Sequence, residues 1–142
     1  MYEATGRPLS ELQRRGATGS SLRPAEIVLA SPDRELARHR IETRFHAMLE
    51  RGFLAEVEGL YRRGDLSPVL PSMRLVGYRQ VWRHLAGETD RETMVRQAVV
   101  ATRQLAKRQR TWLRSVPGAV WFDPDDSNLV DKVLKFLVAT LK

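Results

Sequence analysis

Five basic side chains lie along one side of the helix that the apolar pattern predicts over residues 89–114. At about 100° per residue they fall within about 60° of one another; they are Arg96, Arg103, Lys107, Arg110 and Arg114. No Asp or Glu occurs between residues 93 and 122 to relieve their mutual repulsion. A stripe of this kind is tolerable where an anion neutralises it, so we expect contact with a nucleic-acid backbone. A solvated face and an anionic membrane surface are the alternatives that the same charges allow.

The opposite side of this helix is narrow, apolar and rich in small residues. It carries Met94, Ala98, Ala101, Leu105 and Trp112. Such a face suits packing against protein better than insertion into lipid, which favours nucleic acid over membrane as the partner.

Two further groups of basic residues lie on predicted helices. Arg40, Arg44 and Arg51 share one flank of a helix expected to end near Glu50. In a helix expected over residues 72–86, Gly77 costs about 1 kcal/mol relative to alanine, so another helix or a ligand should approach it closely. The neighbouring Tyr78 could either stack on a base or pack with its hydroxyl satisfied inside the protein.

Composition supports a polyanion as the partner. The 142 residues contain 24 Lys and Arg against 17 Asp and Glu, for a formal charge of +7 and a pI near 10.5. Without cysteine the chain can form no disulfide and no thiolate metal site. It has no apolar run of about 18 residues and no secretory signal pattern at its start, so we expect a soluble, cytoplasmic protein.

Other kinds of site are disfavoured. His39, His46 and His84 lack metal-ligand spacing. The aspartates of residues 123–126 lack the glycine and glutamate of a calcium loop, so we interpret them as a turn that caps the last helix. Ser115 has no nearby histidine or acidic partner and is no candidate nucleophile.

The elements that position these residues are mostly helices. We predict helices over residues 31–50, capped by Ser31 with Pro32 in the first turn, over 54–63, over 72–86, over 89–114 with a Thr89–Glu92 capping box, and from about Asn128 onward. The first of these should bury a face made by Ala37, Ile41, Phe45, Met48 and Leu49. The last should pack through an apolar stripe made by Val130, Val133, Leu134, Leu137, Val138 and Leu141.

Short apolar runs at residues 27–29 and 120–122 predict two strands, the first with no partner nearby in sequence. Residues 1–14 and 15–24 are expected to form a short helical piece and a mobile loop. The domain division is therefore 1–24 and 25–142.

Several linked stretches resemble one family in the same order. They are TGRPLS at residues 5–10, RIETRFHAML at 40–49 with Gly52, Phe53, Glu56 and Val57, LPSMRLVGYRQ at 70–80, and TRQLAKRQ at 102–109 followed by TWLR at 111–114. On these stretches the chain resembles the C-terminal part of bacterial tRNA dimethylallyltransferases over nearly its whole length.

The resemblance implies a mainly α part, of about five helices and one or two short strands, of a P-loop nucleotide-kinase-like α/β fold. In that family the N6 amine of the adenosine 3′ of the anticodon attacks dimethylallyl diphosphate and expels diphosphate. The resemblance assigns Arg44 to the diphosphate of the prenyl donor, where a guanidinium would stabilise the growing leaving-group charge.

The resemblance also assigns two segments to contact with the tRNA anticodon stem-loop. They comprise Arg74, Leu75, Val76, Gly77, Tyr78, Arg79, Val100, Ala101, Thr102, Arg103, Gln104, Leu105, Ala106 and Lys107. Some of these residues would grip phosphates, and others would help to hold the extruded adenosine.

The departures from the family pattern concern catalysis. No G-x-x-x-x-G-K-[ST] phosphate loop occurs in this sequence. The family's general-base aspartate and Mg²⁺-binding hydroxyl are likewise expected in a preceding half. The resemblance therefore implies no catalytic residue and no metal ligand here, an inactive chain on its own, and a strand at residues 27–29 that joins a larger sheet.

Two other classes of function stay open at this point. The chain could be a stand-alone helical nucleic-acid-binding module, with the helices around Gly87 imitating a helix-turn-helix. It could also be a protein-interaction bundle whose arginines are merely exposed. If the chain is instead part of the family's larger fold, its exposed strand edge and bare core face would invite dimerisation or strand exchange, so we expect self-association.

Overall fold

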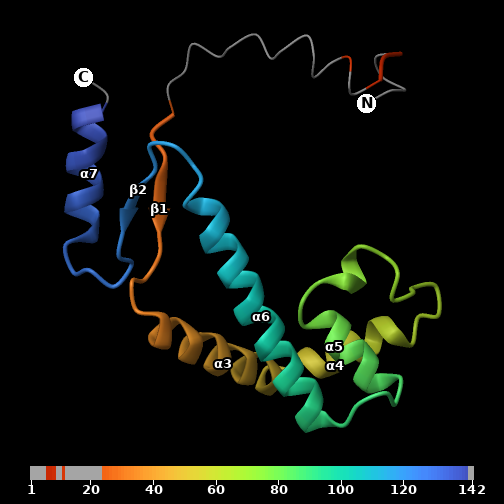
Figure 1. The fold of residues 1–142 in the computed structure, drawn as a ribbon. Coiled ribbons are helices and arrows are strands. Elements are labelled where there is room, and N and C mark those ends of the chain that lie inside the picture. The colour runs from red at the N-terminus through yellow and green to blue at the C-terminus, as the bar shows by residue number, and fades with distance from the viewer. Residues whose placement is uncertain (1–5, 9–10, 12–23, 141–142) are drawn as a thin grey trace.

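A computed structural model describes residues 6–8, 11 and 24–140 of the chain. The elements run in the order β1 (Ile27–Leu29), α3 (Arg34–Glu50), α4 (Phe53–Tyr61), the 3-10 turn η1 (Ser72–Arg74), α5 (Tyr78–Leu85), α6 (Arg91–Leu113), β2 (Val120–Phe122) and α7 (Leu129–Thr140) (Figure 1). The mainly α architecture with two short strands is the one predicted. Most of the N-terminal segment predicted as a helical piece and a loop lies outside the described residues.

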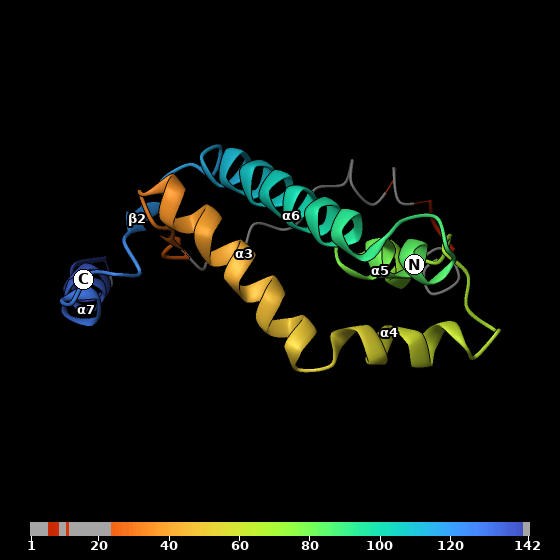
Figure 2. The same ribbon diagram turned by 90° about the horizontal axis from the view of Figure 1, so that it is seen from below.

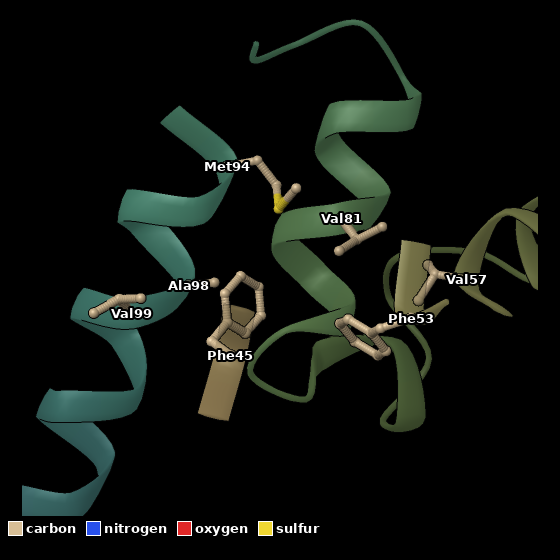
Figure 3. Packing of buried hydrophobic residues seen from close by; sticks show 7 residues of the cluster. All are labelled: Phe45, Phe53, Val57, Val81, Met94, Ala98 and Val99. Carbon is tan, nitrogen blue, oxygen red and sulfur yellow. The ribbon is translucent and has the colours of Figure 1, made fainter. Parts of the chain in front are cut away.

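Helices α3, α4, α5 and α6 together enclose the main core. Its buried side chains come from all four helices (Figure 3): Phe45, Phe53, Val57, Val81, Met94, Ala98 and Val99. The predicted buried face of α3 is confirmed, since Phe45 is in the core and Ile41, Met48 and Leu49 pack against it. Edge-on ring contacts join α3, α4 and α5 through Phe45, Phe53 and Tyr78.

The N-caps predicted at Ser31 and Thr89 are wrong by two residues and by one residue, respectively. Asp33, not Ser31, caps α3, and its carboxylate accepts hydrogen bonds from the backbone N–H groups of Glu35 and Leu36 at 2.8 and 3.0 Å. Asp90, not Thr89, caps α6 and accepts from the N–H of Thr93 at 2.6 Å. A charged carboxylate next to the first turn is the better acceptor, because it also complements the positive end of the helix dipole.

The helix predicted over residues 72–86 is divided into two. After η1 the chain is extended at Leu75, and α5 begins behind Gly77, which has φ 96° and ψ −62°. The side-chain oxygen of Gln80 accepts the N–H of Gly77 at 2.8 Å and stabilises this start. A Cβ at position 77 would lie 3.3 Å from Cζ of Phe53, so the expected close approach is made by an aromatic ring.

The two strands pair with each other in parallel, with Ile27 opposite Val120 and Leu29 opposite Phe122. The partner that local sequence did not offer to β1 is therefore β2, which follows the whole helical part (Figure 1). A parallel pair of this kind needs a long crossover, here α3 to α6.

Helix α7 lies beyond the strands and contacts them through the rings of Phe122 and Phe136, whose centroids are 6.0 Å apart. None of its residues is buried, and Val130, Leu134 and Val138 of the predicted packing stripe are exposed. Leu141, the last member of that stripe, lies outside the described residues. No helix within residues 24–140 is long and apolar enough to cross a membrane.

Candidate nucleic-acid interface

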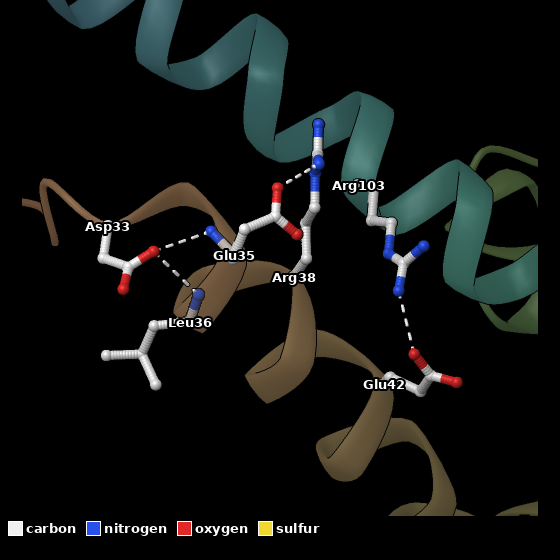
Figure 4. A network of polar contacts seen from close by, with 6 residues as sticks. All are labelled: Asp33, Glu35, Leu36, Arg38, Glu42 and Arg103. Atoms are coloured by element: carbon white, nitrogen blue, oxygen red, sulfur yellow. Dashed lines mark hydrogen bonds and ion pairs between the residues drawn. The ribbon is translucent and has the colours of Figure 1, made fainter.

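Helix α6 packs along α3 (Figure 2), and two members of its basic stripe bond to α3 and to the segment that precedes it. The Nη2 group of Arg103 donates to Oε2 of Glu42 at 2.8 Å (Figure 4). The Nη1 group of Arg110 donates to the carbonyl oxygen of Ser31 at 3.0 Å. These two arginines therefore have structural partners, which the helical-wheel prediction of one uniform stripe did not anticipate.

The other three members of the stripe are exposed. Arg96, Lys107 and Arg114 make no ion pair with the residues that the structure describes, although Arg96 donates to the hydroxyl of Thr93 at 3.2 Å. Arg108, which follows Lys107 in sequence but lies outside the stripe, is also exposed and lines a shallow concavity with Gln104, Lys107 and Thr111. The α6 surface thus retains a set of cationic side chains available to an anion.

The apolar side of α6 follows the prediction except near the end of the helix. Met94 and Ala98 are fully buried, and Ala101 and Leu105 are half-buried. Trp112 was expected on this face but is 67% exposed. The C-terminal end of α6 extends beyond the four-helix core toward β2 (Figure 1).

The predicted tRNA segment on α6 divides into exposed and packed positions. Val100, Gln104 and Lys107 are exposed, whereas Ala101, Leu105 and Ala106 are half-buried. The hydroxyl of Thr102 donates to the carbonyl oxygen of Ala98 one turn earlier, so it is internally satisfied.

The other predicted tRNA segment surrounds the start of α5, a helix that packs against α6. Arg74 and Arg79 are exposed and form no ion pair within the described part of the chain, and Leu75 is also exposed. Val76 is half-buried and Gly77 is buried. Two exposed arginines therefore flank the tight turn at Gly77.

Tyr78 packs inside the protein. Its hydroxyl donates to the carboxylate of Glu56 on α4, and its ring stands edge-on to Phe53 with centroids 5.2 Å apart. The hydrogen bond to Glu56, with partial burial, raises the pKa of Tyr78 above its ordinary value. Of the two possibilities left open by the sequence, the satisfied hydroxyl is the one that the structure contains.

The three arginines on the flank of α3 line one groove together with His39 and Thr43. Arg40 is bound by both carboxylate oxygens of Asp125, at 2.9 and 2.7 Å, and this partner raises the pKa of the guanidinium. Arg44 and Arg51 are exposed and have no ion-pair partner among residues 24–140. The groove therefore presents two uncompensated positive charges, on Arg44 and Arg51.

His84 and Asp126, two of the residues considered as metal ligands, make structural contacts. Asp126 accepts from the N–H of Asn128 at 2.8 Å and pairs with Lys132, as expected for a turn that leads into α7. His84 Nδ1 lies 2.8 Å from the carbonyl oxygen of Thr89. Among the described residues, no group of three or more His, Asp or Glu side chains is placed to hold a metal ion.

A profile of the IPP transferase family matches residues 1–116, which is most of the chain. The chain belongs to the IPP transferase family. The predicted fold class, a mainly α part of the P-loop nucleotide-kinase-like fold of these transferases, is confirmed by two solved structures. The tRNA isopentenylpyrophosphate transferase of Bacillus halodurans matches 93% of this chain and 44% of its own, with a TM-score of 0.79 and 28% identity. That of Staphylococcus epidermidis, at 23% identity and a TM-score of 0.70, supports the fold alone.

Curated relatives of this family member are tRNA dimethylallyltransferases. That of Coxiella burnetii is 49% identical over 138 residues, covering 96% of this chain and 46% of the relative. That of Methylococcus capsulatus is 48% identical, covering 99% of this chain and 46% of the relative. The chain thus spans less than half the length of the relatives that it matches.

Three acidic residues that shape the surface of this IPP transferase chain were missed by sequence reasoning. Glu42, Glu56 and Asp125 each hold a side chain of a predicted functional helix. Their partners are 61, 22 and 85 residues away. No local spacing rule connects residues at such separations, so only the folded chain could identify these pairs.

Proposed function

We propose that the chain is the tRNA- and prenyl-diphosphate-binding part of an enzyme that transfers a dimethylallyl group to N6 of the adenosine 3′ of the anticodon. Membership in the IPP transferase family and the names of the relatives support this reaction. We also propose that these 142 residues alone do not catalyse transfer. The family resemblance assigns the phosphate loop and the general base to residues outside this sequence.

The observation that carries the RNA-binding part is the exposed cationic surface of α6. Arg96, Lys107 and Arg114 are exposed on the side of α6 away from buried Met94 and Ala98, and none of the three forms an ion pair within the described part of the chain. Mutual repulsion on one rigid helix is relieved when phosphates replace the solvent around these groups.

The proposed tRNA contacts divide by chemistry. Lys107, Arg74 and Arg79 would grip phosphates, since they are exposed cations. Gln104 and Val100 are exposed on α6 and could meet bases or sugars. Gly77, Tyr78 and the half-buried residues of both segments would act by shaping the surface. They are Val76, Ala101, Thr102, Leu105 and Ala106.

Arg44 would bind the diphosphate of the prenyl donor. Its guanidinium is exposed beside Arg51 in the α3 groove, without a carboxylate that a diphosphate would have to displace. In the reaction the adenosine nitrogen forms a bond to the prenyl carbon while the bond to the diphosphate oxygen breaks. A guanidinium bound to the diphosphate lowers the barrier because negative charge on the leaving oxygens increases in the transition state.

Mg²⁺ is the metal that the family resemblance implies for the complete enzyme, to neutralise diphosphate charge. The described residues provide no cluster of ligands for it. We therefore assign no step of the reaction to a metal held by this part of the chain.

Binding of an anticodon stem-loop RNA, measured by fluorescence anisotropy at increasing NaCl, tests the proposal. We expect the logarithm of the binding constant to fall linearly with the logarithm of salt, by about 0.7–0.9 for each phosphate contacted. Binding that is absent at low salt, or that does not change with salt, would reject an RNA-binding role.

Titration with inorganic diphosphate tests Arg44 separately. Arg44→Gln should weaken binding by about tenfold or more, the loss of one charge-assisted contact. Arg38→Gln on the same helix is the matched control, because Arg38 lies outside the groove and pairs with Glu35. Equal diphosphate affinity in the two variants would remove Arg44 from the site.

A further inference from the structure

The ion pair between Glu42 and Arg103 links two functional helices. It joins α3, which carries Arg44, to α6, which carries the exposed cations (Figure 4). In the part of the chain that the structure describes, no other ion pair connects these two helices. Each residue of the pair lies within a regular helix, Glu42 on α3 and Arg103 on α6. The bond to Glu42 therefore gives the Arg103 guanidinium a defined orientation.

Arg103 keeps donors free for a ligand while it is held. A guanidinium has five N–H donors, and the bond to Glu42 uses one of those on Nη2. The Nη1 group has no partner among the described residues, and the side chain is 37% exposed. The Nε atom is buried without any hydrogen-bond partner, so the stem is fixed by packing and by Glu42 alone.

Arg103 and Glu42 both line a groove between α3 and α6. Arg91 and Arg96 line the same groove, and Val95, Val99 and Val100 form its apolar part. The charged and titratable groups of the groove also include Glu92 and His46. The groove therefore combines three arginines with an apolar surface, a composition that suits a phosphate of an RNA strand.

We propose that Glu42 is a positioning residue for RNA binding, which holds Arg103 with its remaining donors directed at a phosphate. This inference rests on the proposed function of α6. An arginine that is already oriented loses less side-chain freedom when a ligand arrives. The carboxylate has an opposite effect too, since its charge repels a nearby phosphate, and a test must separate orientation from charge.

Two substitutions at position 42 separate the effect of orienting Arg103 from the effect of the Glu42 charge. Glu42→Gln and Glu42→Ala remove the same charge, but only glutamine keeps a side-chain oxygen that can accept from Nη2 of Arg103. We expect the Glu42→Gln variant to bind anticodon stem-loop RNA about fivefold more tightly than the Glu42→Ala variant. Affinities are measured on the 142-residue chain well below the melting temperature of every variant.

The same comparison in an Arg103→Ala background identifies the residue through which Glu42 acts. There the difference between the Glu42→Gln and Glu42→Ala variants should disappear, because no guanidinium remains to be oriented. A purely structural role would change the melting temperature of the Glu42→Ala variant but leave RNA affinity equal at low temperature. If Glu42→Ala does not fold, Glu42→Met, equal in length to glutamine but without a strong acceptor, replaces it.

Each outcome decides between distinct ideas. An affinity difference between Glu42→Gln and Glu42→Ala that depends on Arg103 supports the positioning role. Equal affinities, or a difference that persists without Arg103, overturn the role of Glu42 and leave RNA binding by α6 intact. Absence of salt-dependent RNA binding by the unsubstituted chain overturns the positioning role together with the proposed function.

Discussion

The four-helix part and the C-terminal helix of this chain differ in what covers their apolar faces. Helices α3 to α6 bury side chains from one another, and Met94, Val57 and Val81 are fully enclosed. Helix α7 has an equally regular apolar stripe, yet Val130, Leu134 and Val138 are exposed and no residue of the helix is buried. An apolar periodicity therefore identifies a face that can pack, but not the element that it packs against.

The connection between the two regions is correspondingly small. Among the described residues it includes the β1–β2 pair, the Phe122–Phe136 ring contact and the Arg40–Asp125 ion pair. Stability of the chain should therefore depend on the four-helix core and hardly on α7. Self-association through the exposed apolar face stays a prediction, and a light-scattering mass equal to one chain would contradict it.

The largest expected effect comes from removing a buried side chain of the core. Met94→Ala should reduce the free energy of unfolding by about 3 kcal/mol, since it leaves a cavity among α3, α5 and α6. The matched change Leu134→Ala in α7, at a side chain 54% exposed, should cost about 0.5 kcal/mol. Urea unfolding measures both, and similar losses would mean that α7 packs as tightly as the core.

The turn before α5 should be the next most sensitive position. Gly77→Ala should cost about 2 kcal/mol, because the backbone there has a positive φ and the new methyl meets the ring of Phe53. Gly87→Ala, also at positive φ but with no atom within 4 Å of the added methyl, should cost about 1 kcal/mol. If the two variants lose the same stability, the Phe53 contact has no role in selecting glycine.

Removing the N-cap of α6 should have a smaller effect on stability than the changes at Met94 and Gly77. Asp90→Ala should lower the melting temperature by about 4 °C, because the first turn loses the acceptor for the N–H of Thr93. Thr89→Ala should leave it nearly unchanged, since the Thr89 hydroxyl has no hydrogen-bond partner. A greater fall in melting temperature for Thr89→Ala than for Asp90→Ala would show that Thr89 caps α6, as the sequence predicted.

The smallest effect concerns the ion pair that joins the two regions. The hydrogen bond from Arg40 holds the pKa of Asp125 below its ordinary value of 3.8. The folded state therefore binds the proton less readily than the unfolded state, and the stabilisation is complete above about pH 5. It is lost as the pH falls through the lowered pKa of Asp125.

Asp125→Asn removes this titrating group with little change of shape. The melting temperature of the variant should fall less steeply than that of the parent chain below about pH 4, with a small difference at neutral pH because the pair is exposed. Parallel curves over the whole acid range would show that the Arg40–Asp125 pair contributes nothing to stability.

Local patterns predicted the helices well and their connections poorly. The end of α3 before Gly52 and the buried face through Phe45 follow from periodicity and from a glycine that accepts a positive φ. The caps were misplaced because neighbouring polar residues compete for the first-turn N–H groups, and the final backbone path decides which one reaches them. Gly77 was predicted to lie inside a helix. The loss of helix stability that a glycine causes there was in fact the sign that the helix is interrupted.

Tertiary contacts limited the prediction of the candidate site. The exposed position of Lys107 follows from the helical wheel and from the absence of acidic neighbours. The attachment of Arg103 to Glu42 and of Arg110 to the Ser31 carbonyl depends on the crossing of α3 and α6, which periodicity does not specify.

The most direct test of the RNA-binding surface compares two losses of a single positive charge. Lys107→Gln removes an exposed cation of α6, and Arg62→Gln removes one beyond the end of α4 that pairs with Glu58. The central claim predicts that Lys107→Gln weakens binding of the anticodon stem-loop RNA severalfold and reduces the salt slope by about 0.7–0.9, whereas Arg62→Gln changes neither. Equal effects of the two variants would contradict it, because they would show attraction to net charge instead of to the α6 surface.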